Sequence, residues 1–295
     1  NIRLTMVSPL EALLPRGQGD AVGGNRNAAR IVGETPGLLQ YVVIDPRHPE
    51  TYRQADAVTL STPSEAALLA RGGLDTPCFT IPLLQPIPPF PPPCPTEDLL
   101  FVGNFSHPPN LDAVRFFYRE IWPRVRKELP GLGIDLVGPE VPLALQRWQQ
   151  PGFRLRGHVP FLEPFLRERR IFVAPLRFGA GIKGKILLAL AHGLPVISSP
   201  LGLEGTPLVP GRDVLVARGP AEWVRAIVRL DRDGPRRERL ARQGYETLRR
   251  HYHPDLLAPR LRATMDKLLR VRRRPPPPYA PPVPQGKIWP TPVVV

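Results

Sequence analysis

Short runs of four or five apolar residues alternate with helix-length segments through the middle of the chain. The runs predict strands at Leu99–Val102, Ile134–Val137, Phe153–Leu155, Ile171–Ala174, Pro195–Ser198 and Val214–Val216. The segments between them predict helices over Leu111–Glu128, Val141–Gln149, Phe161–Arg169, Lys183–His192 and Ala221–Leu230. Such alternation is typical of a parallel sheet that is covered by helices on both faces. We therefore predict an α/β fold whose larger part is a doubly wound, Rossmann-like sheet of six parallel strands.

Two helix starts can be read from local signals. Asn110 is a suitable N-cap for the first of these helices, with Asp112 in its first turn. Upstream, Ser61 and Thr62 precede Pro63, and Glu65 follows, which predicts a helix over 65–70. Around that helix the pattern predicts strands at 41–44, 57–60 and 79–82 and a short helix near 50–54. Residues 1–40 carry weak periodicity and predict no particular element.

Proline marks the domain organisation. Residues 85–95 read QPIPPFPPPCP, which is too rich in proline for a helix or a sheet interior and predicts a stiff linker. The linker separates a smaller α/β domain over 1–84 from the six-stranded domain over 96–253. Helices are predicted at 236–251 and 254–270, and the proline-rich end, 271–295, predicts a disordered tail.

Charge and composition narrow the function classes. The net charge of +14 favours contact with any polyanion, whether nucleic acid, anionic lipid or nucleotide. A solvated arginine-rich surface explains this charge better than a dedicated nucleic-acid face, so nucleic acid is not an expected partner. Cys78 and Cys94 are too few for a disulfide framework, and the cysteines and histidines show no metal-binding spacing. With no apolar run long enough to cross a bilayer, we expect a cytoplasmic protein without a metal site.

Anion-binding chemistry is indicated directly after the predicted strand at 171–174. The segment FGAGIKGK contains a glycine turn and leads into a helix that begins with Lys183 and Lys185. Both lysines could be exposed residues of a first turn. Because a cation opposes the helix dipole at that end, a bound anion explains them better. The segment matches neither the Walker loop nor the dinucleotide fingerprint.

Four further glycine-bearing loops follow predicted strands, at 103–107, 138–140, 157–160 and 200–205. The carboxyl ends of parallel strands meet at one edge of the sheet, where ligands bind near the reversal of strand order. Glycine lets backbone N–H groups approach a ligand closely. The five loops together indicate a nucleotide cleft.

The segments FVGNFSHPPNLDAVRFF, RGHVP and VAPLRFGAGIKGKILLALAHGLPVISSPLGLEG resemble the donor-binding half of glycosyltransferase family 4, the "group 1" type. The resemblance extends over about residues 40–268. It implies a GT-B fold, in which two Rossmann-like domains face each other and the last helix returns to the first domain. The first domain would then be partial or diverged, because residues 1–40 are too few to build the rest of it.

The resemblance also implies a site and a reaction. Gly103 and Asn104 would lie beside the diphosphate or sugar, and the backbone at His158 and Val159 would edge the nucleobase. The positions expected to wrap the phosphates and the donor sugar are Phe178, Gly179, Ala180, Gly181, Lys183 and Lys185. The implied activity is that of a hexosyltransferase which retains configuration and needs neither metal nor cofactor. Its substrates would be a UDP- or GDP-sugar and a glycan or lipid-linked acceptor of cell envelope polysaccharide, with peripheral contact at the inner face of the membrane.

One departure from the family pattern keeps other interpretations open. The second glutamate of the family's Glu-x7-Glu pattern, which reaches the nucleotide ribose, falls on Leu188, and the first falls on Ala180. A leucine side chain cannot accept a hydrogen bond. Losing the glutamate acceptor could cost about 1.5–3 kcal/mol of donor binding. Glu204 is a possible replacement acceptor. The alternatives are a degenerate, non-catalytic GT-B module and a basic polyanion-binding protein, and no catalytic residue is assigned.

Overall fold

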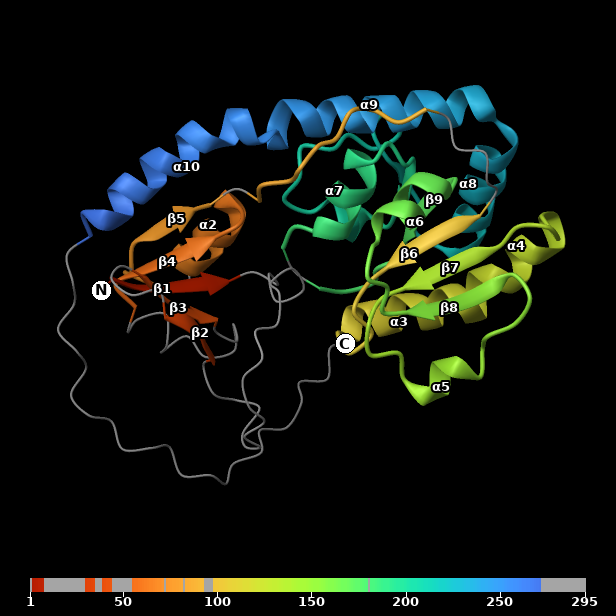
Figure 1. The fold of residues 1–295 in the computed structure, drawn as a ribbon, viewed down its shortest axis with the longest axis horizontal. Helices are drawn as coiled ribbons and strands as arrows, with labels where there is room; N and C mark the ends of the chain where they lie inside the picture. Colours follow the sequence, from red (N-terminus) through yellow and green to blue (C-terminus); the bar gives the residue numbers. More distant parts are fainter. Residues whose placement is uncertain are drawn as a thin grey trace.

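The computed structural model describes residues 2–7, 30–34, 39–43, 55–71, 73–81, 83–92, 98–179 and 181–271. The short helix expected near 50–54 and the tail from 272 onward lie outside these residues, as does part of the proline segment. The chain forms two sheets, which lie side by side in Figure 1 beneath a long pair of helices.

The larger sheet has six parallel strands in the order β11-β10-β9-β6-β7-β8. They are β6 (Leu99–Val102), β7 (Ile134–Val137), β8 (Phe153–Gly157), β9 (Ile171–Ala174), β10 (Val196–Ser198) and β11 (Leu215–Val216). The chain builds outward from β6 to β8, returns to β9 beside β6, and then builds in the opposite direction. This is the doubly wound order, and the prediction of a six-stranded parallel sheet is confirmed.

Helices join these strands with bounds that differ from the predicted ones at their ends. They are α3 (Pro108–Phe116), η2 (Phe117–Ile121), α4 (Trp122–Glu128), α5 (Leu143–Gln146), α6 (Glu163–Glu168), α7 (Gly184–Ala191), η3 (Pro200–Leu203) and α8 (Pro220–Arg232). The helix predicted over 111–128 opens into the π-helical segment η2 just before Pro123. Proline lacks an N–H group and crowds the carbonyl four residues earlier, so a regular helix cannot continue through it.

The predicted N-cap at Asn110 is wrong. α3 begins three residues earlier than predicted, with His107 as its cap and with Pro108 and Pro109 in its first turn. Proline is favoured there because the first N–H groups of a helix have no partner within it. Asn110 therefore lies inside the helix, and its side chain is free for tertiary contacts.

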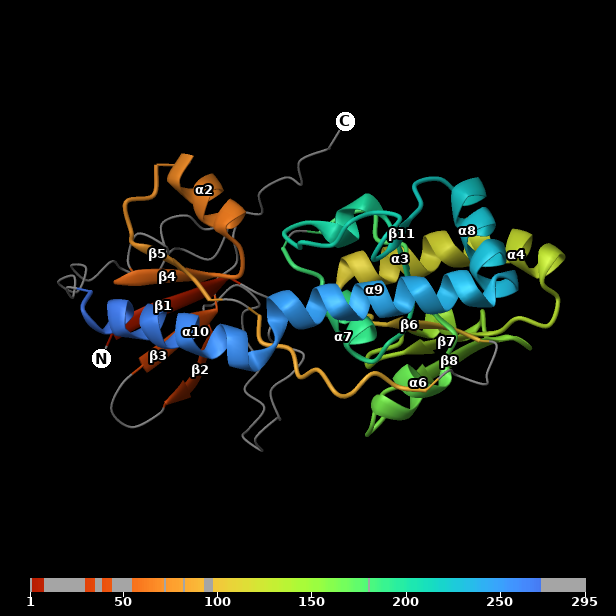
Figure 2. The same ribbon diagram turned by 90° about the horizontal axis from the view of Figure 1, so that it is seen from above.

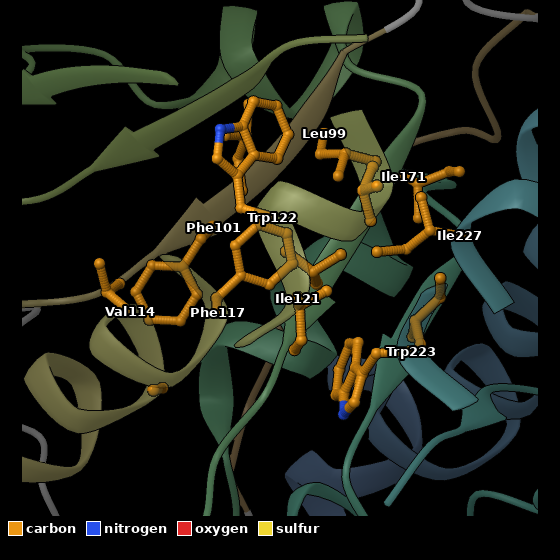
Figure 3. Packing of buried hydrophobic residues seen from close by; sticks show 14 of the residues in the cluster. Leu99, Phe101, Val114, Phe117, Ile121, Trp122, Ile171, Trp223 and Ile227 are labelled. Carbon is orange, nitrogen blue, oxygen red and sulfur yellow. The ribbon is translucent and has the colours of Figure 1, made fainter. Parts of the chain in front are cut away.

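The strands of the larger sheet send alternate side chains into two apolar clusters. Leu99 and Phe101 of β6 belong to one cluster, and Leu100 belongs to the other. Figure 3 shows the first cluster, where Phe117 and Trp122 pack toward β6 while Trp223 and Ile227 enter from α8. The sheet is thus buried on both faces, as a parallel sheet requires.

A buried carboxylate organises the outer strands β7 and β8. Asp135 has no exposed surface and accepts hydrogen bonds from Arg154, Arg156 and Arg169 at 2.6–2.8 Å. Burial opposes ionisation of Asp135, but the three guanidinium groups outweigh it and lower its pKa. Charged side chains on the edge strand β8 also discourage pairing with another chain.

The smaller sheet has five strands in the order β2-β3-β1-β4-β5. They are β1 (Ile2–Val7), β2 (Arg30–Glu34), β3 (Leu39–Val43), β4 (Ala57–Leu60) and β5 (Cys78–Thr80), with α2 (Pro63–Arg71) between the last two. β1 lies in the centre, parallel to β3 and β4, and β2 is antiparallel. The weakly periodic N-terminal residues therefore contribute two strands that the sequence pattern did not predict.

The proline segment and the last two helices connect the sheets. Residues 83–92 are extended and pack on the larger domain, where Tyr245 donates to the carbonyl of Pro88 at 2.8 Å and its ring meets Phe90 edge-on. α9 (Gly234–Tyr252) covers the larger domain, and α10 (Pro254–Leu269) continues over the smaller sheet, as Figure 2 shows from above. Leu268 of α10 packs against Ala57 of β4. α10 is thus in contact with the smaller sheet.

Candidate functional site

The reversal of strand order lies between β6 and β9, at the centre of the larger sheet. The loop that begins with Gly103 follows β6, and the segment from 175 to 183 follows β9. Two loops that leave neighbouring strands in opposite directions open a crevice at the carboxyl edge of a sheet. The candidate site is built here, and the loop after β10, which contains Glu204, adjoins it.

The glycine turn after β9 has backbone angles that require glycine. Gly179 has φ 117° and Gly181 has φ 74°, both in the region that side chains disfavour. Arg177 fastens the start of the turn to α3 by a bidentate ion pair with Asp112. Ala180 lies outside the described residues. The turn is thus held against α3, and Arg177, which sequence reasoning missed, holds it there.

Two helix N-termini point to this crevice, and they differ in their free donors. In α3, Pro108 and Pro109 have no N–H, and the amides of Asn110 and Leu111 both donate to the carbonyl of His107. In α7 the amides of Gly184 and Lys185 have no hydrogen-bond partner among the described residues. The first turn of α7 also contains no acidic side chain. Its N-terminus is therefore the one that offers open N–H groups and the positive end of a dipole to an anion.

Lys185 lies beneath the loop that follows β6. Its ammonium group donates to Asn110 Oδ1 and lies 4.8 Å from the ring centroid of Phe101. A Cβ atom at Gly103 would stand 2.9 Å from the Lys185 Nζ, so only glycine fits above it. Burial, and then the charge of Lys183, lower the pKa of Lys185 to about 7. The first-turn exposure considered for this lysine is thus wrong.

Asn110 ties this lysine to the β6 loop. It is buried, and its Nδ2 donates to the backbone carbonyl of Asn104 at 2.8 Å while its Oδ1 accepts from Lys185. The Asn104 side chain turns back on its own loop and accepts from the amide and hydroxyl of Ser106, each at 2.8 Å. His107 lies close by, and burial followed by the positive charge of Lys185 lowers its pKa. The loop is therefore held by its own hydrogen bonds and by Asn110 of α3, which is in turn held by Lys185 of α7.

Lys183 faces the other side of the turn. Its side chain is 10% exposed, and its ammonium donates to the carbonyl of Gly181 and lies 3.4 Å from a carboxylate oxygen of Glu204. Burial lowers the pKa of Lys183, and the negative charges of Glu204 and Glu65 oppose this shift. Lys183 is thus not an exposed first-turn residue either, and it lies among carboxylates.

The remaining predicted positions lie at different distances from this centre along the sheet. Leu188 packs against the second apolar cluster and presents no hydrogen-bond acceptor. His158 is exposed and Val159 is partly buried, and both follow β8, two strands away from β6. Phe178 is 47% exposed at the entrance to the glycine turn. The structure thus brings together a central set and leaves Phe178, His158, Val159 and Leu188 at the periphery; the central set is Gly103, Asn104, Gly179, Gly181, Lys183, Lys185 and Glu204.

A search of the described ranges for metal ligands finds no group of three or more His, Cys, Asp or Glu residues that could hold an ion. Within the same ranges, no helix combines the length and apolar character that crossing a bilayer requires.

Two α/β sheet domains, with α10 packing on the smaller sheet, have the arrangement of the GT-B class of fold. Residues 96–233 match the family described as glycosyl transferases group 1.

Known proteins with similar sequence or fold include three that cover between about half and three quarters of this chain. An uncharacterized 44.6 kDa protein in the cps region of Klebsiella pneumoniae is 24% identical over 164 residues, which cover 52% of this chain and 42% of that protein. TarM of S. aureus superposes with a TM-score of 0.64 at 12% identity, over 75% of this chain and 45% of TarM. The pneumococcal O-GlcNAc transferase GtfA superposes with a TM-score of 0.62 at 16% identity, over 78% of this chain and 49% of GtfA. The chain thus spans less than half the length of each of these proteins.

Proposed function

We propose that the protein is a retaining glycosyltransferase that moves a sugar from a nucleotide-sugar donor to a glycan or lipid-linked acceptor without a metal ion. The donor would be a UDP- or GDP-sugar, and a lipid-linked acceptor would bring the protein into peripheral contact with the inner face of a membrane. The family of the larger domain supports the class of reaction. The finer statements rest on the chemistry of the site.

The observation that carries the proposal is the N-terminus of α7. It combines two amides that have no hydrogen-bond partner among the described residues, a glycine turn that admits close approach, and Lys183 and Lys185 within one turn. A diphosphate is the ligand that such a constellation suits, because it carries multiple negative charges and acceptor oxygens. The other helix N-terminus at the crevice, that of α3, has its first donors removed or satisfied.

The same groups suit the reaction. During glycosyl transfer negative charge develops on the departing diphosphate, and preorganised N–H groups and ammonium groups stabilise it. In this proposal no protein nucleophile is required. The solved structures of TarM and GtfA were determined in complex with UDP, which makes UDP the first nucleotide to test.

Isothermal titration calorimetry with UDP and GDP tests the proposal. We expect one of them to bind with a dissociation constant in the micromolar to millimolar range. Lys267→Ala, on the exposed face of α10, serves as a control for loss of general positive charge and should bind like the wild type. The absence of binding by either nucleotide at millimolar concentration would overturn the proposal.

Leu188 supports a second candidate, a non-catalytic module of the same fold. An apolar side chain stands where the family pattern has a ribose-binding glutamate, and it packs against the buried cluster. A module of this kind binds nucleotide weakly and releases no UDP from a UDP-sugar. Measuring UDP release over many hours, with and without added glycan, separates the two candidates.

A further inference from the structure

We propose that Glu65, which belongs to the first domain, is a donor-binding residue whose carboxylate accepts a hydrogen bond from a hydroxyl of the donor sugar. The inference rests on the proposed function, because it concerns the same crevice. It adds a contact from the smaller domain, which otherwise contributes no residue to the site described above.

One oxygen of the Glu65 carboxylate has a local structural role. The backbone amide and the hydroxyl of Thr62 donate to Oε2 at 2.8 and 3.0 Å, and the Glu65 amide donates back to the Thr62 hydroxyl at 3.2 Å. This is a capping box, which satisfies the first N–H groups of α2. The contacts fix the orientation of the carboxylate at the start of the helix.

The other oxygen faces the second domain. Glu65 Oε1 lies 3.1 Å from the position that a Cβ atom would take at Gly181. Among the described residues, no group donates a hydrogen bond to Oε1. A carboxylate oxygen of a partly buried residue that faces the glycine turn and has no donor among the described residues is an acceptor available to a ligand.

The contact between the two domains at this point is close and depends on glycine. The methyl group of Thr62 lies 2.7 Å from the position of a Cβ at Gly205, in the loop after β10. The start of α2 therefore packs on two loops of the larger domain, those that contain Gly181 and Gly205. Because both loops belong to the crevice, Glu65 lies at its wall rather than on a remote surface.

The charge at this position favours a sugar hydroxyl over a phosphate. An ionised carboxylate only accepts hydrogen bonds, so it repels phosphate oxygens and attracts O–H donors. Its negative charge is favoured by the dipole at the start of α2, and it opposes the burial that lowers the pKa of Lys183. With Lys183 and Lys185 available for the diphosphate, Glu65 suits the uncharged, hydroxyl-rich part of the donor.

Donor affinity in the variant Glu65→Gln tests this role. Glutamine also completes a capping box, so α2 keeps its start while the charged acceptor is lost. Calorimetry is performed with UDP and with UDP-glucose and UDP-GlcNAc as probes. We expect the variant to bind UDP within about twofold of the wild type and to bind the better UDP-sugar about fivefold to tenfold more weakly.

Two control variants separate this role from a structural one. Thr62→Ala breaks the capping box but keeps the carboxylate, so the preference for UDP-sugar over UDP should persist. Glu163→Gln, in an exposed ion pair with Arg167 on α6, should change neither affinity. Equal losses of the preference in Thr62→Ala and Glu65→Gln would show that only the helix start matters and would overturn the inference.

The remaining outcomes are also decisive. Tighter binding of both UDP and UDP-sugar by Glu65→Gln would mean that the carboxylate opposes the phosphates, which overturns a role in binding sugar. Unchanged UDP-sugar binding overturns it as well, while leaving the proposed function intact. A wild-type protein that binds no nucleotide would overturn the proposed function, and this inference with it.

Discussion

Lys183 and Lys185 are separated by a single residue at the start of α7, yet they lie in opposite surroundings. Lys185 points under the β6 loop, where it contacts Asn110 and the ring of Phe101, both within the larger domain. Lys183 points toward Glu204, and the negative charge of Glu65 in the smaller domain also acts on its pKa. A side chain at a helix start can face either wall of a crevice, and these two face different walls. An anion at this N-terminus would therefore raise the pKa of Lys185 and would compete with the carboxylates for Lys183.

The largest expected effect comes from removing the lysines one at a time. Lys185→Ala should weaken UDP binding by about tenfold to a hundredfold, because a charged contact in a desolvated site is worth about 1.5–3 kcal/mol. Lys183→Ala should cost less, since Lys183 must first give up Glu204. Calorimetry at pH 7 compares the two variants. Equal losses of UDP affinity in the two variants would show that the different surroundings of Lys183 and Lys185 do not affect UDP binding.

Removing the partner of Lys185 should lower stability. Asn110→Ala leaves the Lys185 ammonium and the Asn104 carbonyl without their contacts, so the free energy of unfolding should fall by about 1–3 kcal/mol. Urea unfolding measures the change. Asn110→Asp keeps an acceptor for the ammonium and should lose less. An alanine variant within about 0.5 kcal/mol of the wild type would show that the network contributes little.

The pH dependence of binding distinguishes the two lysines further. The pKa of Lys185 is about 7 in the free protein, and a diphosphate beside it would raise that pKa. The complex then holds more protons than the free protein, so UDP affinity should fall as pH rises above 7, by at most tenfold per pH unit. Dissociation constants at pH 7.5, 8.5 and 9.5 measure the slope, and Lys185→Met should flatten it. A wild-type affinity that does not change over this range would contradict the burial of an uncharged Lys185.

The smallest effect on stability and on UDP affinity is expected from a change at Glu204, beside Lys183. Glu204 is about half exposed and lies 3.4 Å from the Lys183 ammonium, so the pair is screened by water. Glu204→Gln should change the free energy of unfolding by less than about 1 kcal/mol. The same variant should bind UDP as well as the wild type or slightly more tightly, because a negative charge near the phosphates is removed. Urea unfolding and calorimetry report both quantities, and a large loss of UDP affinity would instead assign Glu204 to the donor.

The regular part of the fold follows from local pattern, and the exceptions have physical causes. The inner strands β6, β7, β9 and β10 were predictable because each is a short, mainly apolar run that is buried in the sheet. The break at η2 depends on Pro123, whose effect four residues upstream is not visible in hydrophobic periodicity. The strands β1 and β2 come from weakly periodic sequence, and their pairing with β3 provides the order that the pattern lacks.

In the site, too, some residues could be predicted from local sequence and others could not. The glycine turn and its lysines could be found from sequence, because a phosphate-binding turn needs glycine angles and positive charge at adjacent positions. Asn110 and Glu65 could not. Asn110 looks like a helix cap and Glu65 belongs to a helix-start signal, and both signals describe only the nearest few residues. Their contacts with Lys185 and with the turn at Gly181 join residues that are 75 and 116 positions apart.

By itself the sequence determined the α/β alternation, the doubly wound sheet and the position of an anion-binding helix start, because these depend on neighbouring residues and on burial. Only the tertiary structure decided where the two lysines point, which helix start keeps its donors open, and that a carboxylate of the first domain meets the glycine turn of the second. Those outcomes depend on packing between segments far apart in the chain. Local propensity carries no information about such distances.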